Sequence, residues 1–231
     1  MSKRAETRGL QERDRMRQRF LAAGAVTLVA LAVGGFLIWR TNQPIGEIVE
    51  VPKVQPAQAD GRSAGPADAK VTVEVFSNFT CPHCGTYAKN AGRQIFESYV
   101  NQGKVRVQYR YIAFPGASRE AAIAAECAGQ QGQFWPYHDI LFANETGAAD
   151  QFSQPRLLGF ADKLQLQGDT FRACMASTTP IDAIEADMAR ATELKIESTP
   201  SIVVNGEMIS GARDFATFQE LIERKLKEIP S

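Results

Sequence analysis

The sequence predicts an α/β domain with an all-helical insertion, preceded by a single N-terminal transmembrane helix and a flexible linker. Three observations support this prediction. Residues 20–39 carry no charged side chain, and an alternating apolar segment runs directly into two closely spaced cysteines. A long stretch with helical spacing of its apolar residues then separates two strand-forming regions.

The charge balance argues against one class of function. The chain has 26 basic and 26 acidic residues among its 231, and its aromatic residues are not interleaved with basic runs. Proteins that bind nucleic acid usually concentrate basic residues on one face or along one segment. We therefore expect no nucleic-acid partner.

The N-terminal region predicts a membrane anchor. Residues 1–19 are rich in Lys and Arg, and residues 20–39 read FLAAGAVTLVALAVGGFLIW. As a helix this run would extend about 30 Å, the thickness of the hydrocarbon layer. The positive-inside bias then keeps residues 1–19 in the cytoplasm and places the chain after Arg40 outside. A cleaved signal peptide ending near residues 30–32 and a buried core helix are the alternatives, but the apolar character continues to Trp39, which favours an uncleaved anchor.

Residues 40–66 predict a flexible linker. They contain four prolines with scattered Gly, Ala, Gln and Ser, a composition that favours an extended chain over a packed core. Weak alternation over residues 45–51 leaves open one additional strand. The globular domain is expected over residues 67–231.

The domain is predicted to open as β-α-β. Residues 70–79 are β-branched, aromatic and alternating, as in a strand. A helix is expected over residues 82–100, with Pro82 in the first turn, where a missing N–H costs least. Residues 104–114 alternate again and predict the second strand.

The second half is predicted to be helical until its last hairpin. Residues from about 117 to 196 show helical spacing and no strand signal. Two short strands then flank Asn205-Gly206, the strongest two-residue turn signal, and the amphipathic segment FATFQELIERKLKEI closes the domain as a helix.

Cys81 and Cys84 stand where the first strand meets the first helix, in the motif Cys-Pro-His-Cys. A Cys-x-x-Cys pair occurs in zinc knuckles, permanent disulfides and redox enzymes. Zinc needs further ligands, and Cys127 and Cys174 could supply them only from the helical insertion. Because a helix N-terminus favours a thiolate over a thiol, the position of Cys81 favours exchange chemistry, and we predict no metal.

Four segments together resemble the DsbA-like thiol:disulfide oxidoreductases, specifically their membrane-anchored bacterial branch. They are VFSNFTCPHC, AAECAGQQGQFWPYHDILF, STPSIVVNGEMISGA and the closing helix. The resemblance covers residues 61–229 and implies a thioredoxin-like fold without a dissociable cofactor. It implies that Cys81 forms the mixed disulfide with a client and that Cys84 resolves it. A histidine at the position of His83 goes with oxidising enzymes in this family, because it stabilises the reduced thiolate.

The resemblance also bears on Thr199 and Pro200. Thioredoxin-like enzymes place a cis-proline here, facing the cysteines, and the residue before it offers backbone groups to an extended client peptide. The alternative is a proline that merely opens a strand.

The remaining cysteines and the second histidine are given structural roles. In an oxidising compartment we expect Cys127 and Cys174 to bond to each other, two buried free thiols being the alternative. His138 is a tempting catalytic residue, but a helix histidine beside aromatic residues usually packs or caps. The same packing role is expected for Phe134, Trp135, Tyr137 and Phe142.

One position departs from the family pattern. DsbA-like enzymes commonly carry a buried acid six residues before the first cysteine, where it helps to move protons, and Val75 stands there in this chain. Glu74 is the nearest acid, but strand alternation turns it to the other side of the sheet. Either the strand shifts its register or water moves the proton.

Together these features predict an extracytoplasmic, membrane-tethered oxidoreductase that donates a Cys81–Cys84 disulfide to reduced secreted or envelope proteins. A membrane thiol oxidase would then reoxidise it. The alternatives are a reductase or isomerase of the same fold and a binding or chaperone-like module with an idle disulfide. His83 favours oxidation, and the short linker leaves no room for the dimerisation domain that isomerases of this superfamily usually carry.

Overall fold

The computed structural model describes residues 21, 24–36 and 45–228 of the chain. The chain forms two compact units, residues 1–45 and 46–231. The second unit holds all the strands that the structure describes and all four cysteines.

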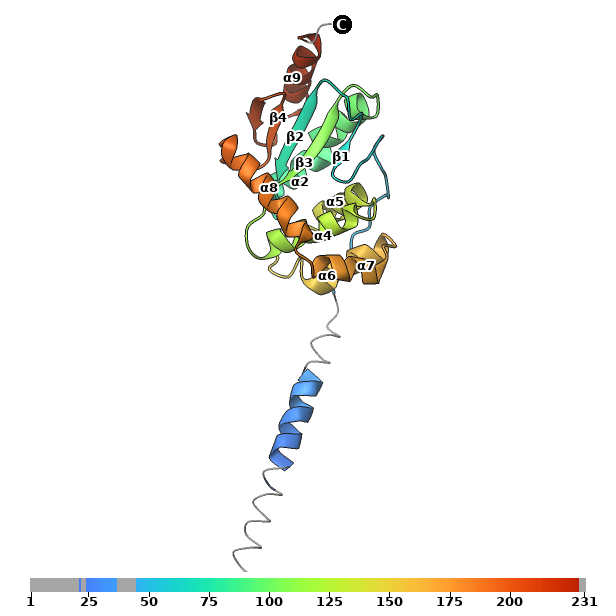
Figure 1. Cartoon of the computed structure of the whole chain (residues 1–231), viewed down its shortest axis with the longest axis vertical. Coiled ribbons are helices and arrows are strands. Elements are labelled where there is room, and N and C mark those ends of the chain that lie inside the picture. The colour runs from blue at the N-terminus through green and yellow to red at the C-terminus, as the bar shows by residue number, and fades with distance from the viewer. Residues whose placement is uncertain (1–20, 22–23, 37–44, 229–231) are drawn as a thin grey trace, which may run out of the picture. The chain divides into compact units, whose positions relative to one another are not determined.

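The first unit contains the predicted membrane anchor. Its described residues are 21, 24–36 and 45, and all but residue 45 are helical (Figure 1). Among the described residues no helix is long and apolar enough to cross a membrane, so the predicted span is not found there. The rest of the expected span over 20–39, and the whole basic segment 1–19, lie outside the described residues.

The second unit is built on a mixed five-stranded sheet in the order β1-β3-β2-β4-β5 (Figure 1). β2 and β3 are parallel, whereas β1 is antiparallel to β3, and β4 is antiparallel to both β2 and β5. The strands are β1 (Ser63–Ala64), β2 (Thr72–Ser77), β3 (Arg106–Tyr111), β4 (Ser201–Val204) and β5 (Glu207–Ser210). The α/β class and four of these strands were predicted, while β1 lies inside the segment predicted to be linker.

The connection from β2 to β3 is helical throughout its predicted range but is not a uniform α-helix. It consists of α2 (Pro82–Tyr87), the π-helix η1 (Ala88–Gly92), α3 (Arg93–Ile95) and the π-helix η2 (Phe96–Val100). A Cβ on Gly92 would lie 3.1 Å from the carbonyl oxygen of Tyr87. The wider turn therefore packs most easily with glycine at this position.

The hairpin and the last helix follow the prediction closely. Asn205 and Gly206 join β4 to β5 with φ of 43° and 86°, the left-handed region that tight hairpin turns require. The closing helix α9 (Phe215–Lys227) begins at Asp214, whose carboxylate accepts a hydrogen bond from the Thr217 N–H at 3.0 Å. This is the N-cap arrangement that stabilises helix starts.

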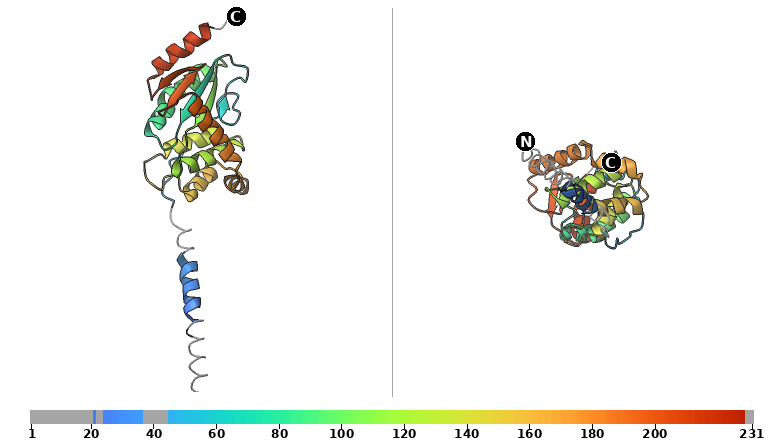
Figure 2. Two further views of the ribbon diagram at one scale, coloured as in Figure 1. Left: turned by 60° about the vertical axis from the view of Figure 1, so that its left-hand side comes forward. Right: turned by 90° about the horizontal axis from the view of Figure 1, so that it is seen from below.

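Five described helices fill the predicted insertion between β3 and β4. They are α4 (Ala117–Gly129), α5 (Phe134–Ala143), α6 (Gln154–Lys163), α7 (Gly168–Met175) and α8 (Thr179–Glu193). α4 is central, because it contacts each of the other four. Its buried face is rich in alanine, which lets these helices approach closely. α4 to α7 gather at one end of the sheet, and α8 runs back beside it (Figures 1 and 2).

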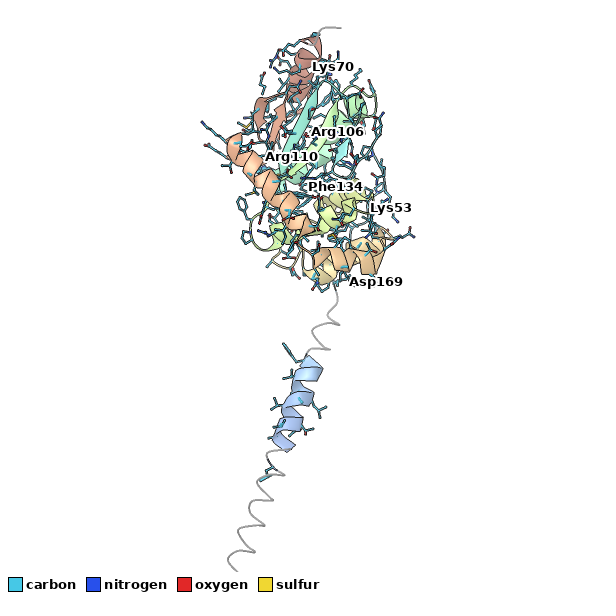
Figure 3. All side chains as sticks on the ribbon, viewed as in Figure 1. Lys53, Lys70, Arg106, Arg110, Phe134 and Asp169 are labelled. Carbon is cyan, nitrogen blue, oxygen red and sulfur yellow. A yellow bond between two sulfur atoms is a disulfide. The ribbon has the colours of Figure 1, made fainter. Side chains whose placement is uncertain are left out.

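A buried carboxylate fixes α8 to the sheet. Asp187 is wholly buried, and its oxygens accept hydrogen bonds from the guanidinium groups of Arg62 and Arg110 and from the Tyr111 N–H. Figure 3 labels Arg110 on the sheet beside α8. Because an unpaired buried charge costs several kcal/mol, this pairing determines where the insertion lies on the sheet.

The predicted linker over 40–66 is wrong from residue 46 onward, because the chain there packs against the domain. The side-chain amide of Asn144 accepts a hydrogen bond from the Val49 N–H at 2.9 Å and donates one to the Val49 carbonyl at 2.8 Å. Ile48 and Val51 pack on the core. These contacts replace the strand left open over residues 45–51, where the structure has none.

A disulfide between Cys127 and Cys174 links α4 to α7 inside the insertion. Both sulfurs lie in the buried core, and the two residues are separated by 47 positions in the sequence. This is the pairing expected from the sequence. The bond restrains a segment that contains α5 and α6.

Replacing both Cys127 and Cys174 by alanine should destabilise the domain. The bond closes a loop of 47 residues, and its loss should lower the free energy of unfolding by about 2–4 kcal/mol. Urea unfolding followed by circular dichroism measures the change, with Cys81→Ala as the control that leaves this disulfide intact. An unchanged midpoint in the double variant would show that α4 and α7 hold together without the bond.

Candidate active site

Cys81 is held at the junction between the sheet and the first helix. β2 ends at Ser77, and the following turn is closed by a hydrogen bond from the Cys81 N–H to the Asn78 carbonyl at 3.1 Å. Cys81 is the N-cap residue of α2, with extended backbone angles, and Pro82 occupies the first helical position. Its side chain is half-buried, so its sulfur can meet a second protein.

Cys84 lies one helical turn further on and is completely buried. The Asn78 N–H lies 3.5 Å from its sulfur and donates a weak hydrogen bond to it. Burial is the main reason that the pKa of Cys84 is raised to about 11, the charge of Cys81 adds to it, and Ser77 and the Asn78 N–H act in the opposite direction. Both residues are free thiols in this structure. At neutral pH the buried sulfur is therefore a protonated thiol.

Thr199 lies directly against the half-buried Cys81 sulfur, although 118 residues separate the two in the sequence, and Pro200 follows it. The peptide bond between Thr199 and Pro200 is cis. The Thr199 carbonyl lies 3.5 Å from the Cys81 sulfur and accepts its hydrogen bond. Pro200 is buried and precedes β4, and its carbonyl accepts a hydrogen bond from the Gly211 N–H at 2.7 Å.

The other residues singled out from the sequence fall in different places. His83 is exposed on α2 between the two cysteines. Cys127 and Cys174 lie in the insertion, bonded to each other, so neither thiol is available to a metal. In the part of the chain that the structure describes, no group of three or more His, Cys, Asp or Glu could hold a metal ion.

The strand register answers the question raised by Val75. Val75 pairs with Tyr109 on β3 and with Ile202 on β4 in a regular ladder, so the strand does not shift. Glu74 faces the opposite side, where it forms ion pairs with Arg110 at 2.9 Å and with Arg190 at 3.4 Å. No acid replaces Val75 on the side of the cysteines from this strand.

A cavity of about 330 Å³, called here the β2–α5 cavity, is lined by Ser77, the residue whose hydroxyl acts on Cys84. Its walls come from β2, β3, α5, the helical connection after Cys84 and the docked segment around residues 51–56. The lining includes Val75, Ser77, Tyr109, His138 and Asp139.

His138 belongs to an aromatic cluster, as expected from the sequence, and also lines this cavity. Its ring lies 4.9–6.0 Å, centroid to centroid, from those of Phe79, Tyr109, Phe134, Trp135 and Phe142. Figure 3 labels Phe134 where the insertion meets the sheet. Tyr137 packs elsewhere, against Phe160 and Phe171.

Ser77 and Tyr109 are the site residues that the sequence reasoning missed. Ser77 lowers the pKa of Cys84, and Tyr109 is a buried phenol that the charges of both cysteines influence. Ser77 could have been found, because alternation from Val75 places it on the same side of β2. The position of Tyr109 follows only from the pairing of β2 with β3.

Known proteins share this architecture. The thioredoxin family model matches residues 58–224. Disulfide bond formation protein D of Bacillus subtilis is 28% identical over 178 residues, which cover 75% of this chain and 80% of that protein. The crystal structure of oxidised BdbD from Bacillus subtilis superimposes with a TM-score of 0.66 and 26% identity, covering 78% of this chain and all of that one.

A second kind of relative is much longer. The Na(+)/H(+) antiporter NhaA 1 of Salinispora arenicola is 34% identical over 151 residues, which cover 64% of this chain. The chain spans only 22% of that antiporter's length. The similarity is therefore to one part of a larger protein.

The family model covers well over half of the chain, and relatives that match most of it are named for disulfide bond formation. The chain belongs to the thioredoxin family, among its DsbA-like thiol:disulfide oxidoreductases.

Proposed function

We propose that this chain is an extracytoplasmic protein disulfide oxidase that transfers its Cys81–Cys84 disulfide to reduced secreted or envelope proteins. The observation that carries the proposal is the asymmetry of the two sulfurs. The Cys81 sulfur is half-exposed beside the Thr199 carbonyl, and the Cys84 thiol is wholly buried one turn behind it. A client can therefore reach only one of them.

The proposed reaction begins with the Cys81–Cys84 disulfide. A client thiolate attacks the Cys81 sulfur, the mixed disulfide forms, and Cys84 leaves and takes up a proton. A second client thiolate then attacks the client sulfur of the mixed disulfide, so that the client gains a disulfide and Cys81 leaves as a thiolate. Thr199 supports this step, because its backbone groups beside Cys81 can pair with an extended client segment as an added strand.

His83 supports the oxidising direction over a reductase or isomerase. It is the exposed residue between the two cysteines, beside the helix N-terminus. Both features favour a thiolate on Cys81, and a stabilised reduced state makes the disulfide a stronger oxidant. A membrane thiol oxidase would complete the cycle by reoxidising the pair.

The sequence supports a membrane-tethered location for this activity. The basic segment 1–19 followed by the uncharged run 20–39 is the pattern of an uncleaved signal anchor. The proposed topology places the domain after Arg40 on the extracytoplasmic side, the compartment in which stable disulfides are formed.

The Cys84→Ser variant tests the proposed roles of the two cysteines. It should accumulate mixed disulfides, because the Cys81 thiolate can still attack disulfide-bonded client proteins while the Cys84 thiol that would break the mixed disulfide is gone. Gel mobility of envelope extracts with and without reductant measures these adducts. Cys81→Ser should form none, and adducts confined to that variant would mean that the two roles are reversed.

The His83→Ala variant tests the direction of the reaction. We expect the wild-type reduction potential to lie well above the value of about −270 mV that is typical of a reductase such as thioredoxin, and to fall by about 30 mV for each tenfold loss of thiolate stabilisation. Equilibration with glutathione buffers measures both proteins, with the exposed Thr86→Ala as the matched control on the same helix. A wild-type potential near that of thioredoxin would favour a reductase.

Cell fractionation tests the location. The full chain should sediment with membranes and resist extraction by salt, whereas a chain lacking residues 1–40 should remain in solution and still oxidise a reduced model protein, because the tether contributes position and not chemistry. Recovery of the full chain in the soluble fraction would contradict the anchor.

A further inference from the structure

The resolving thiol must exchange a proton although it is sealed from solvent. Cys84 is completely buried, and burial raises its pKa to about 11. Val75 occupies the position where a buried acid would lie, and Glu74 is turned to the far side of the sheet and paired with Arg110 and Arg190. A carboxylate from β2 is therefore not available to accept the proton.

The hydroxyl of Tyr109 is a buried polar group near the Cys84 thiol. Its side chain is only 2% exposed, and beyond a polar contact with Ser77 the hydroxyl has no hydrogen-bond partner of ordinary geometry among the described residues. Leaving such a group unpaired costs about 1–3 kcal/mol, so a buried hydroxyl of this kind calls for a partner such as water. Ser77 lies close enough to influence the pKa of both Tyr109 and Cys84.

The Tyr109 hydroxyl also keeps its proton, as a group that passes protons between water molecules must. Burial holds the pKa of Tyr109 well above its ordinary value, with the charges of Cys84, Asp187 and Cys81 adding to the effect. The phenol therefore stays neutral at physiological pH. A neutral phenol can accept one hydrogen bond and donate another, and so can a serine hydroxyl.

The β2–α5 cavity connects these hydroxyls to the surface. Ser77 on β2 and Tyr109 on β3 line it from the sheet, and His138 and Asp139 line it from α5. The volume of about 330 Å³ accommodates several water molecules, and these polar groups supply the partners that buried water requires. The His138 Nδ1 lies 2.9 Å from the Asp139 carboxylate, which is 41% exposed. Asp139 therefore gives the cavity lining a group that solvent reaches.

We propose that the β2–α5 cavity is the proton path of Cys84, in which water molecules held by Ser77, Tyr109 and His138 carry the proton to Asp139 and solvent. The inference rests on the proposed function, because it concerns the step in which Cys84 resolves a mixed disulfide. Ser77, Tyr109 and His138 are positioning residues here, since they hold the water and do not contact the client.

The oxidant that forms the Cys81–Cys84 disulfide in this step is another disulfide. When glutathione disulfide has formed a mixed disulfide with Cys81, the Cys84 thiol gives its proton to the water chain. Its sulfur attacks the Cys81 sulfur, the Cys81–Cys84 bond forms, and the bond to glutathione breaks. Glutathione leaves as a thiolate that is protonated in solvent. Attack on the Cys81–Cys84 disulfide by a client returns a proton to Cys84 along the same path.

Tyr109→Phe tests this path in the purified full chain. The reduced protein is mixed with excess glutathione disulfide and quenched in acid, and mass spectrometry follows the Cys81 adduct as it forms and decays. The decay should slow by about tenfold, a part of what assisted proton transfer usually contributes, while adduct formation is unchanged. Because phenylalanine keeps the ring packing of Tyr109 against Phe79 and His138, the variant should keep its thermal stability.

Tyr111→Phe is the matched control. Tyr111 is a buried tyrosine on the same strand, but its hydroxyl donates a hydrogen bond to Glu126 at 2.9 Å and lies outside the cavity lining. Its adduct should decay at the wild-type rate. Equal slowing in Tyr109→Phe and Tyr111→Phe would assign the effect to packing and overturn the proposal.

A rescue variant separates proton transfer from structure. Val75 lines the same cavity, and Val75→Glu in the Tyr109→Phe background places a titratable acid there, which burial keeps near neutral pKa. In this double variant the Cys81 adduct should again decay fast. In Tyr109→Phe alone, the ratio of the decay rates in H₂O and D₂O should be larger than in the wild type. If the Cys81 adduct of Tyr109→Phe decays at the wild-type rate, the proton path is overturned and the proposed function still stands. Failure of the wild type to form the adduct or the Cys81–Cys84 disulfide would overturn the proposed function and the path with it.

Discussion

The position of the helical insertion depends on the fully buried carboxylate of Asp187. Arg62, Arg110 and the Tyr111 N–H share its oxygens, so α8 has one favourable place against β3. The rest of the insertion follows, because α8 and α7 both pack on α4, and α4 on α5. α5 in turn brings His138 and Phe142 over the ring of Phe79, two residues before Cys81. An ion pair on one side of the sheet thus helps to shape the cavity on the other.

The chemistry of the two cysteines follows from their spacing on one helical turn. Position 81 caps α2 and remains accessible, whereas position 84 points into the core. The same motif on a fully exposed helix would give two similar thiols. Here burial is the main difference between them, because it disfavours a charge on Cys84 and leaves Cys81 as the more accessible sulfur.

The sequence was sufficient wherever local patterns decide the structure. Alternation identified β2 and β3, Asn205-Gly206 identified the hairpin, and the strand-to-helix junction located Cys81. The sequence was insufficient wherever the structure depends on contacts between residues that lie far apart in the chain. β1 has only two residues and forms because Ala64 and Ser63 pair with β3, and the segment after residue 46 docks because Asn144 binds the Val49 backbone. Tyr109 joins the site for the same reason, since its place beside Ser77 depends on strand pairing that no local pattern encodes.

Val75 stands where DsbA-like enzymes commonly carry an acid, and this difference also bears on the direction of the reaction. A carboxylate near the cysteines would disfavour a thiolate on Cys81 by charge repulsion, which would weaken the reduced state. Hydroxyls and water can carry a proton without adding that charge. A neutral path therefore adds no charge that opposes a thiolate on Cys81. Under the proposed function, Val75 in place of the acid is thus compatible with an oxidising enzyme, because the proposed path of hydroxyls and water adds no charge that would destabilise the reduced form.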